Sequence, residues 1–299
     1  MRRLFLPLIA TVYALPAWAE APKVVTDIAP VHALVTMVMG DRGTPDVLLP
    51  AGGDPHDFQL RPSQALALSE AGLVIWVGPA LSPWLERSLD GVDTKAVRLE
   101  LLDAPETVKR EIGGEGAHGH EDHDHGNIDP HAWLSPENGR IWLWLIAGAL
   151  AQADPEGAEI YRENAELGEL KINAAEKVAR GLLAPVKDRP FAVLHDAYGY
   201  YADHFGLTVA GAVRMGDAAQ PGAAHLRALE ADLRASGAVC IFPETNHSEA
   251  MVEQMAQAAG VRLGGVLDPA GVNMTQGAGL YPVVIVGLAT VLAQCLSGD

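Results

Sequence analysis

The sequence has 299 residues, 49% of them hydrophobic, and a formal net charge of −17 at pH 7. So acidic a chain is not expected to bind nucleic acid or an anionic membrane surface, whereas it is compatible with a cation as ligand. Its length is sufficient for two ordinary hydrophobic cores.

The first nineteen residues have the pattern of a secretory signal peptide. Arg2 and Arg3 precede the short apolar run 4–15, and Ala17-Trp18-Ala19 matches a small-x-small cleavage site. The apolar run is too short to span a membrane, and no cysteine near the cleavage site could carry a lipid anchor. We expect residues 1–19 to be removed after Ala19, leaving a soluble periplasmic protein.

Short β-rich runs alternate with helical patterns in the first half of the chain. The expected strands are residues 23–28, 45–49 and 73–77, and the expected helices are residues 31–39, 63–71 and 82–89. Ser63 is expected to cap its helix. The run 73–77 is apolar throughout, as in a strand buried on both faces of a parallel sheet. This order predicts an N-terminal α/β lobe over residues 20–153.

A histidine-rich loop, residues 113–127, interrupts this lobe. It contains His118, His120, His123 and His125 mixed with Glu121, Asp122 and Asp124, and residues 113–126 include no apolar side chain larger than alanine. Imidazoles bind zinc, copper and nickel, and carboxylates add oxygen ligands. We expect a mobile loop that collects zinc weakly; the alternative is a solvated loop without a ligand.

The second half repeats the α/β pattern after a long helical stretch. Residues 136–153 are expected to be helical, 154–184 to form a linking helix, and 185–299 to form a C-terminal lobe. Its expected strands are residues 191–194, 238–242 and 261–267, and its expected helices are residues 221–236, 249–259 and 280–296. The last helix is apolar over 283–293, too few residues to cross a membrane, so we interpret it as a core helix of this lobe.

Three histidines share a setting near the ends of expected strands. His56 follows the strand that ends at residue 49, His131 follows the histidine-rich loop, and His195 directly ends a strand. Ligands of open parallel sheets bind beyond the carboxyl ends of the strands, so these histidines are expected to converge on a cleft between lobes. Three imidazoles and one further ligand suit tetrahedral zinc, the fourth being Asp268 or water.

Nearby carboxylates are expected to hold the second ring nitrogen of each of these histidines. The candidates are Asp54 or Asp57 for His56, Asp129 for His131, and Asp196 for His195. We interpret the remaining histidines outside the loop as structural or solvated, namely His32, His204, His225 and His247. Glu244 is interpreted either as a support for a ligand or as part of a surface turn.

The chain has two cysteines, Cys240 and Cys295. An even number in an oxidising compartment predicts one disulfide, here closing a loop of about 55 residues. The alternative is two buried free thiols.

Several motifs together resemble a known family. In chain order they are Pro55-His56-Asp57-Phe58, Arg61-Pro62-Ser63, the histidine-acid loop, Asp129-Pro-His-Ala-Trp133, His195-Asp-Ala-Tyr198-Gly-Tyr200 and Leu267-Asp-Pro-Ala-Gly271. This pattern is similar to the zinc-specific solute-binding proteins of bacterial ABC importers (ZnuA-type, metal-binding cluster A-I). The resemblance implies two α/β lobes joined by one rigid helix with metal in the cleft between them. It also implies His56, His131 and His195 as ligands, Asp268 at the family's aspartate position, and a Cys240–Cys295 bridge.

The function expected from this resemblance is capture of Zn²⁺ and its delivery to the membrane permease of an ABC importer, by a monomer that is not an enzyme. One alternative is manganese or iron capture by the same fold, although manganese members carry Glu at the position of His195. A second is a zinc-dependent hydrolase, but the sequence has no His-Glu-x-x-His and no Gly-x-Ser-x-Gly motif. A third is a zinc buffer without a permease partner.

Overall fold

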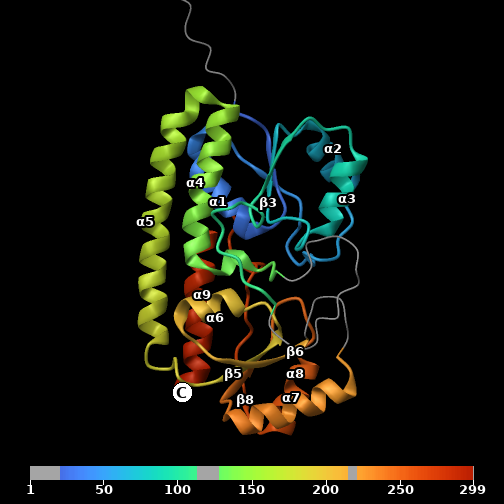
Figure 1. The fold of residues 1–299 in the computed structure, drawn as a ribbon, viewed down its shortest axis with the longest axis vertical. Helices are drawn as coiled ribbons and strands as arrows, with labels where there is room; N and C mark the ends of the chain where they lie inside the picture. Colours follow the sequence, from blue (N-terminus) through green and yellow to red (C-terminus); the bar gives the residue numbers. More distant parts are fainter. Residues whose placement is uncertain (1–20, 113–127, 215–220, 299) are drawn as a thin grey trace, which may run out of the picture.

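The computed structural model describes residues 21–112, 128–214 and 221–298. These residues form two α/β lobes stacked along the long axis of the molecule (Figure 1). The predicted fold class is confirmed, and so is the presence of one long helix that joins the lobes.

The N-terminal lobe contains a four-stranded parallel sheet in the order β2-β1-β3-β4. Its strands are β1 (Val24–Thr26), β2 (Asp46–Val47), β3 (Leu73–Trp76) and β4 (Val97–Glu100). Its helices are α1 (Ala29–Met39), α2 (Pro62–Glu70), α3 (Pro83–Gly91) and α4 (Pro136–Ala153), with short 3-10 turns at Gly40–Arg42, Ala132–Leu134 and Pro155–Gly157. Strand β3 is buried along its whole length, as its apolar sequence predicts.

The C-terminal lobe repeats this topology. Its parallel sheet has the order β6-β5-β7-β8, which is the same sequence of crossovers as in the first sheet. The strands are β5 (Phe191–His195), β6 (Val209–Arg214), β7 (Cys240–Phe242) and β8 (Arg262–Leu263), and the helices are α6 (Gly199–Phe205), α7 (Ala223–Ser236) and α8 (Ala250–Ala259). Helices α7 and α8 cover one face of this sheet with a separate apolar cluster.

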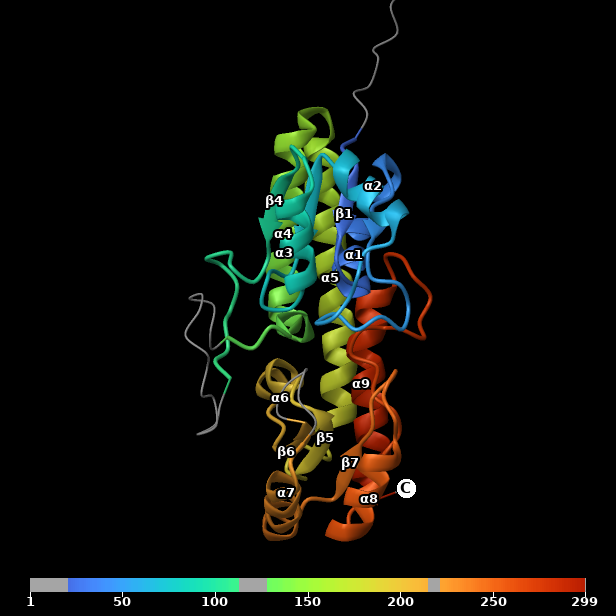
Figure 2. The ribbon, with the colours of Figure 1, turned by 90° about the vertical axis from the view of Figure 1, so that its right-hand side faces the viewer.

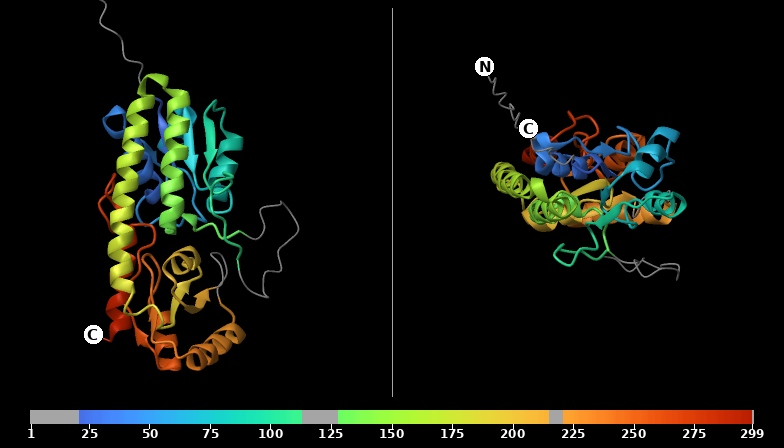
Figure 3. Two further views of the ribbon diagram at one scale, coloured as in Figure 1. Left: turned by 60° about the vertical axis from the view of Figure 1, so that its left-hand side comes forward. Right: turned by 90° about the horizontal axis from the view of Figure 1, so that it is seen from above.

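Two long helices connect the lobes. Helix α5 (Ala158–Leu183) runs along one side of the molecule and packs against α1, α4 and α9 (Leu280–Ser297) (Figures 1 and 3). One hydrophobic core extends from Val24 in β1 to Leu296 in α9. The lobes therefore share packed apolar side chains along α5 and α9, which restricts their relative movement.

Helix α9 is the one helix in the described part of the chain that is long and apolar enough to cross a membrane. It packs against α5 and α1, and the Tyr281 hydroxyl donates to the Trp133 carbonyl at 2.8 Å. Because α1 belongs to the other lobe, α9 is a core helix of both lobes and not of the second alone.

The ends of several elements differ from expectation. Ser63 does not cap α2; Arg61 occupies that position, Pro62 begins the helix, and the Arg61 amide donates to Gln64 Oε1 at 2.8 Å. Proline fits the first helical position because it lacks the amide hydrogen that would have no partner there. The unpredicted strands β4 and β6 lie at sheet edges, where half-exposed residues and Gly211 weaken the apolar pattern.

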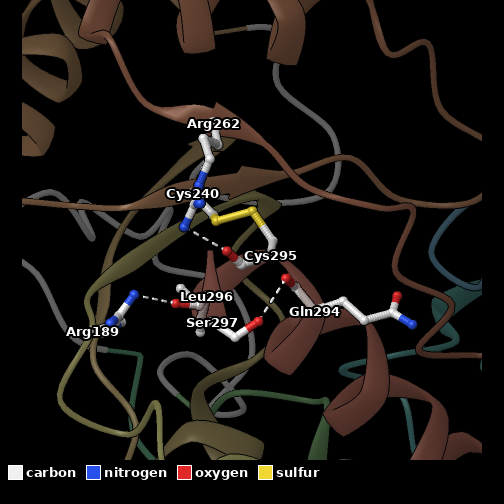
Figure 4. Close-up of a disulfide and its surroundings, with 7 residues drawn as sticks. All are labelled: Arg189, Cys240, Arg262, Gln294, Cys295, Leu296 and Ser297. Atoms are coloured by element: carbon white, nitrogen blue, oxygen red, sulfur yellow. Dashed lines mark hydrogen bonds between the residues drawn. A yellow bond between two sulfur atoms is a disulfide. The ribbon is translucent and has the colours of Figure 1, made fainter. Parts of the chain in front are cut away.

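The predicted disulfide is confirmed. Cys240 at the start of β7 is bonded to Cys295 near the end of α9 (Figure 4). Beside it, Arg262 donates to the Cys295 carbonyl and Arg189 to the Leu296 carbonyl, each at 2.6 Å. Cationic side chains on the last carbonyls of a helix satisfy groups that have no partner within the helix.

Candidate metal centre

His195 is the last residue of β5, which is buried throughout. Strand β5 lies between β6 and β7. The strand order of the sheet reverses between β5 and β7, and open parallel sheets bind ligands beyond the strand ends at such a reversal. Beyond β7, a bridge to Leu267 holds Glu244, whose Oε1 approaches His195 Nδ1 to 3.6 Å. The other oxygen of Glu244 accepts a hydrogen bond from the Tyr198 hydroxyl at 2.8 Å.

The Glu244 side chain is a buried anion supported by its neighbours. Burial acts to raise its pKa, but His195 and the Tyr198 hydroxyl outweigh that effect and hold the pKa below its ordinary value. Conversely, burial and the Glu244 charge raise the pKa of the Tyr198 hydroxyl. The pair thus presents a negative charge to one ring nitrogen of His195, which leaves the other nitrogen for a ligand.

His131 shows this arrangement most completely. It precedes the 3-10 turn at the start of α4 and is 4% exposed. Its Nδ1 lies 2.8 Å from Asp129 Oδ1, which also accepts the His131 backbone amide at 3.0 Å. Among the described residues, its buried Nε2 has no hydrogen-bond partner. A buried nitrogen with a lone pair and no donor is the group that a metal ion would satisfy.

His56 lies on the loop between β2 and α2. Its backbone amide donates to Asp54 Oδ1 at 2.9 Å, and the preceding Pro55 carbonyl accepts from the Trp84 indole at 2.8 Å. Gly52 begins the loop at φ +83°, a conformation that glycine adopts without strain. These contacts hold the loop against α3 of the N-terminal lobe.

The three histidines meet between the lobes. One nitrogen from each, in His56, His131 and His195, lies within 4.8 Å of the others. Their ring centroids are 4.8 to 6.0 Å apart. They line a cavity of about 310 Å³ together with Trp133 and Glu244. Three convergent imidazoles, two of them buried, match three of the four ligands of a typical tetrahedral zinc site.

Asp268 lies outside this group of atoms. Its Oδ1 accepts from the Val272 amide at 2.8 Å and from the Thr245 hydroxyl at 3.3 Å, and its Oδ2 accepts from the Asn273 amide at 2.9 Å. The carboxylate thus fixes the turn that carries Pro269 and Ala270, which line the cavity. His118, His120, His123 and His125 lie outside the described residues, as does the predicted signal peptide.

Sequence reasoning missed two groups near the cavity. His247, interpreted as solvated, lines the cavity and lies 4.0 Å from Glu244 Oε1. Arg110 forms an ion pair with Asp129 at 3.3 Å, although nothing in the local sequence indicates this. By contrast, two other histidines bond to groups away from the cavity, as expected for structural residues. His204 bonds to Glu176, and His225 bonds to the carbonyls of Ala212 and Val213.

Comparison with known proteins shows the family to which the chain belongs. Residues 24–295 match the family model of the periplasmic zinc-uptake complex component A, ZnuA. The high-affinity zinc uptake system protein ZnuA of Paracoccus denitrificans is 46% identical, with 96% of this chain and 95% of that protein covered. The Brucella suis protein of the same name is 34% identical, covering 93% of this chain and 92% of the relative.

Solved structures share the fold. A ZnuA crystal structure has a TM-score of 0.77 and 23% identity, covering 93% of this chain and all of that one. The solute-binding protein FpvC of Pseudomonas aeruginosa, solved with Mn²⁺, has a TM-score of 0.81 and 22% identity, with 92% of this chain and 98% of that one covered. On the match over nearly its whole length, this chain belongs to the ZnuA family of periplasmic zinc-uptake components.

Proposed function

We propose that this protein captures Zn²⁺ in the periplasm and delivers it to the membrane permease of an ABC importer. The observation that carries the proposal is the convergence of His56, His131 and His195 within 4.8 Å in a cavity between the lobes. Zinc is cargo here and not a catalytic cofactor. The protein acts as a monomer after cleavage behind Ala19 and does not bind nucleic acid.

The donor atoms favour zinc over harder cations. Three imidazole nitrogens suit a borderline metal, whereas manganese more often takes carboxylates. Because the Asp268 oxygens already accept three hydrogen bonds, we assign the fourth position to water and give Asp268 the role of supporting the cavity wall. Imidazoles must be deprotonated to bind metal, so zinc affinity should fall on acidification.

A hydrolase would require a general base beside a metal-bound water. Glu244 is the buried carboxylate nearest this role, but its oxygens face His195 and the Tyr198 hydroxyl. Its position therefore supports a role in holding a ligand. Hydrolysis of generic ester or peptide substrates by the zinc-loaded protein would contradict the transport proposal.

The decisive experiment is a competition titration of the metal-free protein with zinc and manganese, together with metal analysis of the protein purified from the periplasm. We expect zinc to be retained and to displace manganese at the tight site. A preference for manganese would overturn the zinc assignment. Deletion of the gene should impair growth at low zinc and be rescued by added zinc; unimpaired growth would instead favour a buffer without a permease.

The histidine-rich loop is proposed as a second, weaker zinc-binding segment. Deleting residues 114–126 should lower total zinc stoichiometry and leave the tight site intact, because His56, His131 and His195 lie outside the deletion. Loss of tight binding by a correctly folded deletion variant would mean that the loop supplies a primary ligand. Unchanged stoichiometry at saturating zinc would favour a solvated loop without a ligand.

A further inference from the structure

The Arg110 side chain lies between carboxylates that belong to opposite lobes. Its Nη1 lies 3.3 Å from Asp129 Oδ2, in the N-terminal lobe. Its Nε lies 2.9 Å from Asp203 Oδ2 on helix α6 of the C-terminal lobe. One guanidinium therefore forms an ion pair on each side of the boundary between the lobes.

The backbone of Arg110 strengthens both connections. Its carbonyl accepts the Asp129 amide at 2.8 Å, and its own amide donates to the Tyr200 hydroxyl on α6 at 2.8 Å. The side chain also lies directly against the first residue of α6: a Cβ on Gly199 would come within 2.2 Å of Arg110 Cζ. Figure 2 shows the segment that ends at residue 112 descending beside α6.

Asp129 connects this contact to the metal centre. While Oδ2 faces Arg110, Oδ1 accepts from the His131 amide and from the His131 ring nitrogen Nδ1. The carboxylate is nearly fully buried, with 3% of its side chain exposed. With both oxygens engaged, Asp129 cannot turn without breaking a contact to Arg110 or to His131, so the orientation of the His131 ring depends on Arg110.

We propose that Arg110 is a positioning residue of the metal centre, which orients His131 through Asp129 and ties that ligand to the C-terminal lobe through Asp203. This inference rests on the proposed zinc-binding function. The two contacts differ in strength because the Asp203 side chain is 68% exposed and that ion pair is screened by water. The contact with buried Asp129 is therefore the stronger determinant of zinc affinity.

The test compares zinc affinities measured by chelator competition. Arg110→Gln should lower the affinity about tenfold, as does loss of other groups that support a ligand. Arg110→Lys, which keeps the charge but cannot make both contacts, should recover part of this loss. Asp203→Asn should cost less than Arg110→Gln. The matched control is Arg140→Gln, since Arg140 is similarly half-buried and pairs with Glu176 on α5 at 2.6 Å; it should bind zinc as the unmodified protein does.

A double-mutant cycle separates positioning from a general structural role. Asp129→Asn should lower zinc affinity, and adding Arg110→Gln to it should change the affinity by less than about twofold, because Arg110 acts through Asp129. Losses that simply multiply in the double variant would overturn the proposal. So would native affinity in Arg110→Gln.

Thermal unfolding of the metal-free variants shows whether they fold. If Arg110→Gln is unstable, Gly199→Ala provides a second test, because the added Cβ displaces the guanidinium without removing its charge. It should also weaken zinc binding, and native affinity there would count against the proposal. Absence of tight zinc binding in the unmodified protein would refute the proposed function and this inference together, whereas tight binding in all variants would refute the inference alone.

Discussion

The two lobes have the same strand order. They differ in what occupies the crevice beyond the ends of the two central strands of each sheet. In the N-terminal lobe the ends of β1 and β3 meet at Asp27, which is fully buried. Its carboxylate accepts hydrogen bonds from the Ile28 amide at 2.8 Å, the Val77 amide at 3.0 Å and the Ser82 hydroxyl at 3.3 Å. The crevice is thus filled by a residue of the chain itself.

In the C-terminal lobe the equivalent ends of β5 and β7 lead to His195 and Glu244, which line the cavity. The N-terminal lobe contributes its two histidines from elsewhere, His56 from the loop after β2 and His131 from the turn before α4. Shared topology therefore provides a crevice in each lobe, and the side chains at the strand ends decide which of them can receive a ligand.

The largest expected effect concerns the disulfide that joins β7 to α9. Strand β7 borders the crevice of the C-terminal lobe, whereas β3, its equivalent in the N-terminal lobe, carries no disulfide. Replacing Cys240 and Cys295 with alanine should lower the free energy of unfolding by up to about 4 kcal/mol, because the bond closes a long loop in the unfolded chain. Urea unfolding measures this. The unmodified protein under reducing conditions should match the variant; a loss below about 1 kcal/mol would show that the bond contributes little.

Asp27→Ala tests the crevice of the N-terminal lobe, which the Asp27 side chain fills. It should lower the free energy of unfolding by about 2 kcal/mol, because buried donors lose their acceptor. Zinc affinity should remain within about twofold, since Asp27 does not line the cavity. Asp90→Ala, at an exposed carboxylate, is the control and should leave stability nearly unchanged. A clear loss of zinc affinity in Asp27→Ala would mean that the two crevices are coupled.

His195→Ala tests the crevice of the C-terminal lobe, which lines the cavity. Unlike Asp27→Ala, it should change zinc affinity more than stability. Zinc affinity should fall at least tenfold, or about 1.4 kcal/mol, while the metal-free protein keeps its stability within about 1 kcal/mol. His225→Ala serves as control because that ring bonds to backbone carbonyls of β6. Competition titration and thermal unfolding provide both values, and near-native affinity would exclude His195 from the site.

The remaining expected effect is a pH dependence of stability that comes from Asp27, the carboxylate that fills the crevice of the N-terminal lobe. Burial raises the pKa of Asp27 to about 6, against the opposing hydrogen bonds from Val77 and Ile28. Between pH 4 and 6 the folded protein therefore holds a proton that the unfolded chain has lost, so this group makes stability fall as pH rises, by at most about 1.4 kcal/mol per unit. The difference between the unmodified protein and Asp27→Asn, followed by urea unfolding across this range, should show that slope; a difference independent of pH would contradict it.

Much of the fold was predictable because it depends on local pattern. The apolar run that became β3, the helix over 136–153 and the end of α5 at Leu183 follow from side-chain periodicity, length and helix-breaking residues. The edge strands β4 and β6 could not be predicted from the sequence, since half-exposed strands carry a weaker apolar signal. Ser63 matches the residue preference of a cap, but Pro62, one residue earlier, begins the helix and moves the cap position to Arg61.

The sequence by itself determined the kinds of chemistry present: three histidines near expected strand ends, a pair of cysteines in a chain predicted to be exported, and an arrangement of motifs typical of one family. Only the tertiary structure decided which carboxylates serve the histidines. Asp129 supports His131 as its position in the chain suggested, but Glu244 reaches His195 from a neighbouring strand end, and Asp268 is occupied by its own turn. Contacts such as Arg110 to Asp203 join residues that are far apart in sequence, and no local pattern encodes them because they depend on how the two lobes pack.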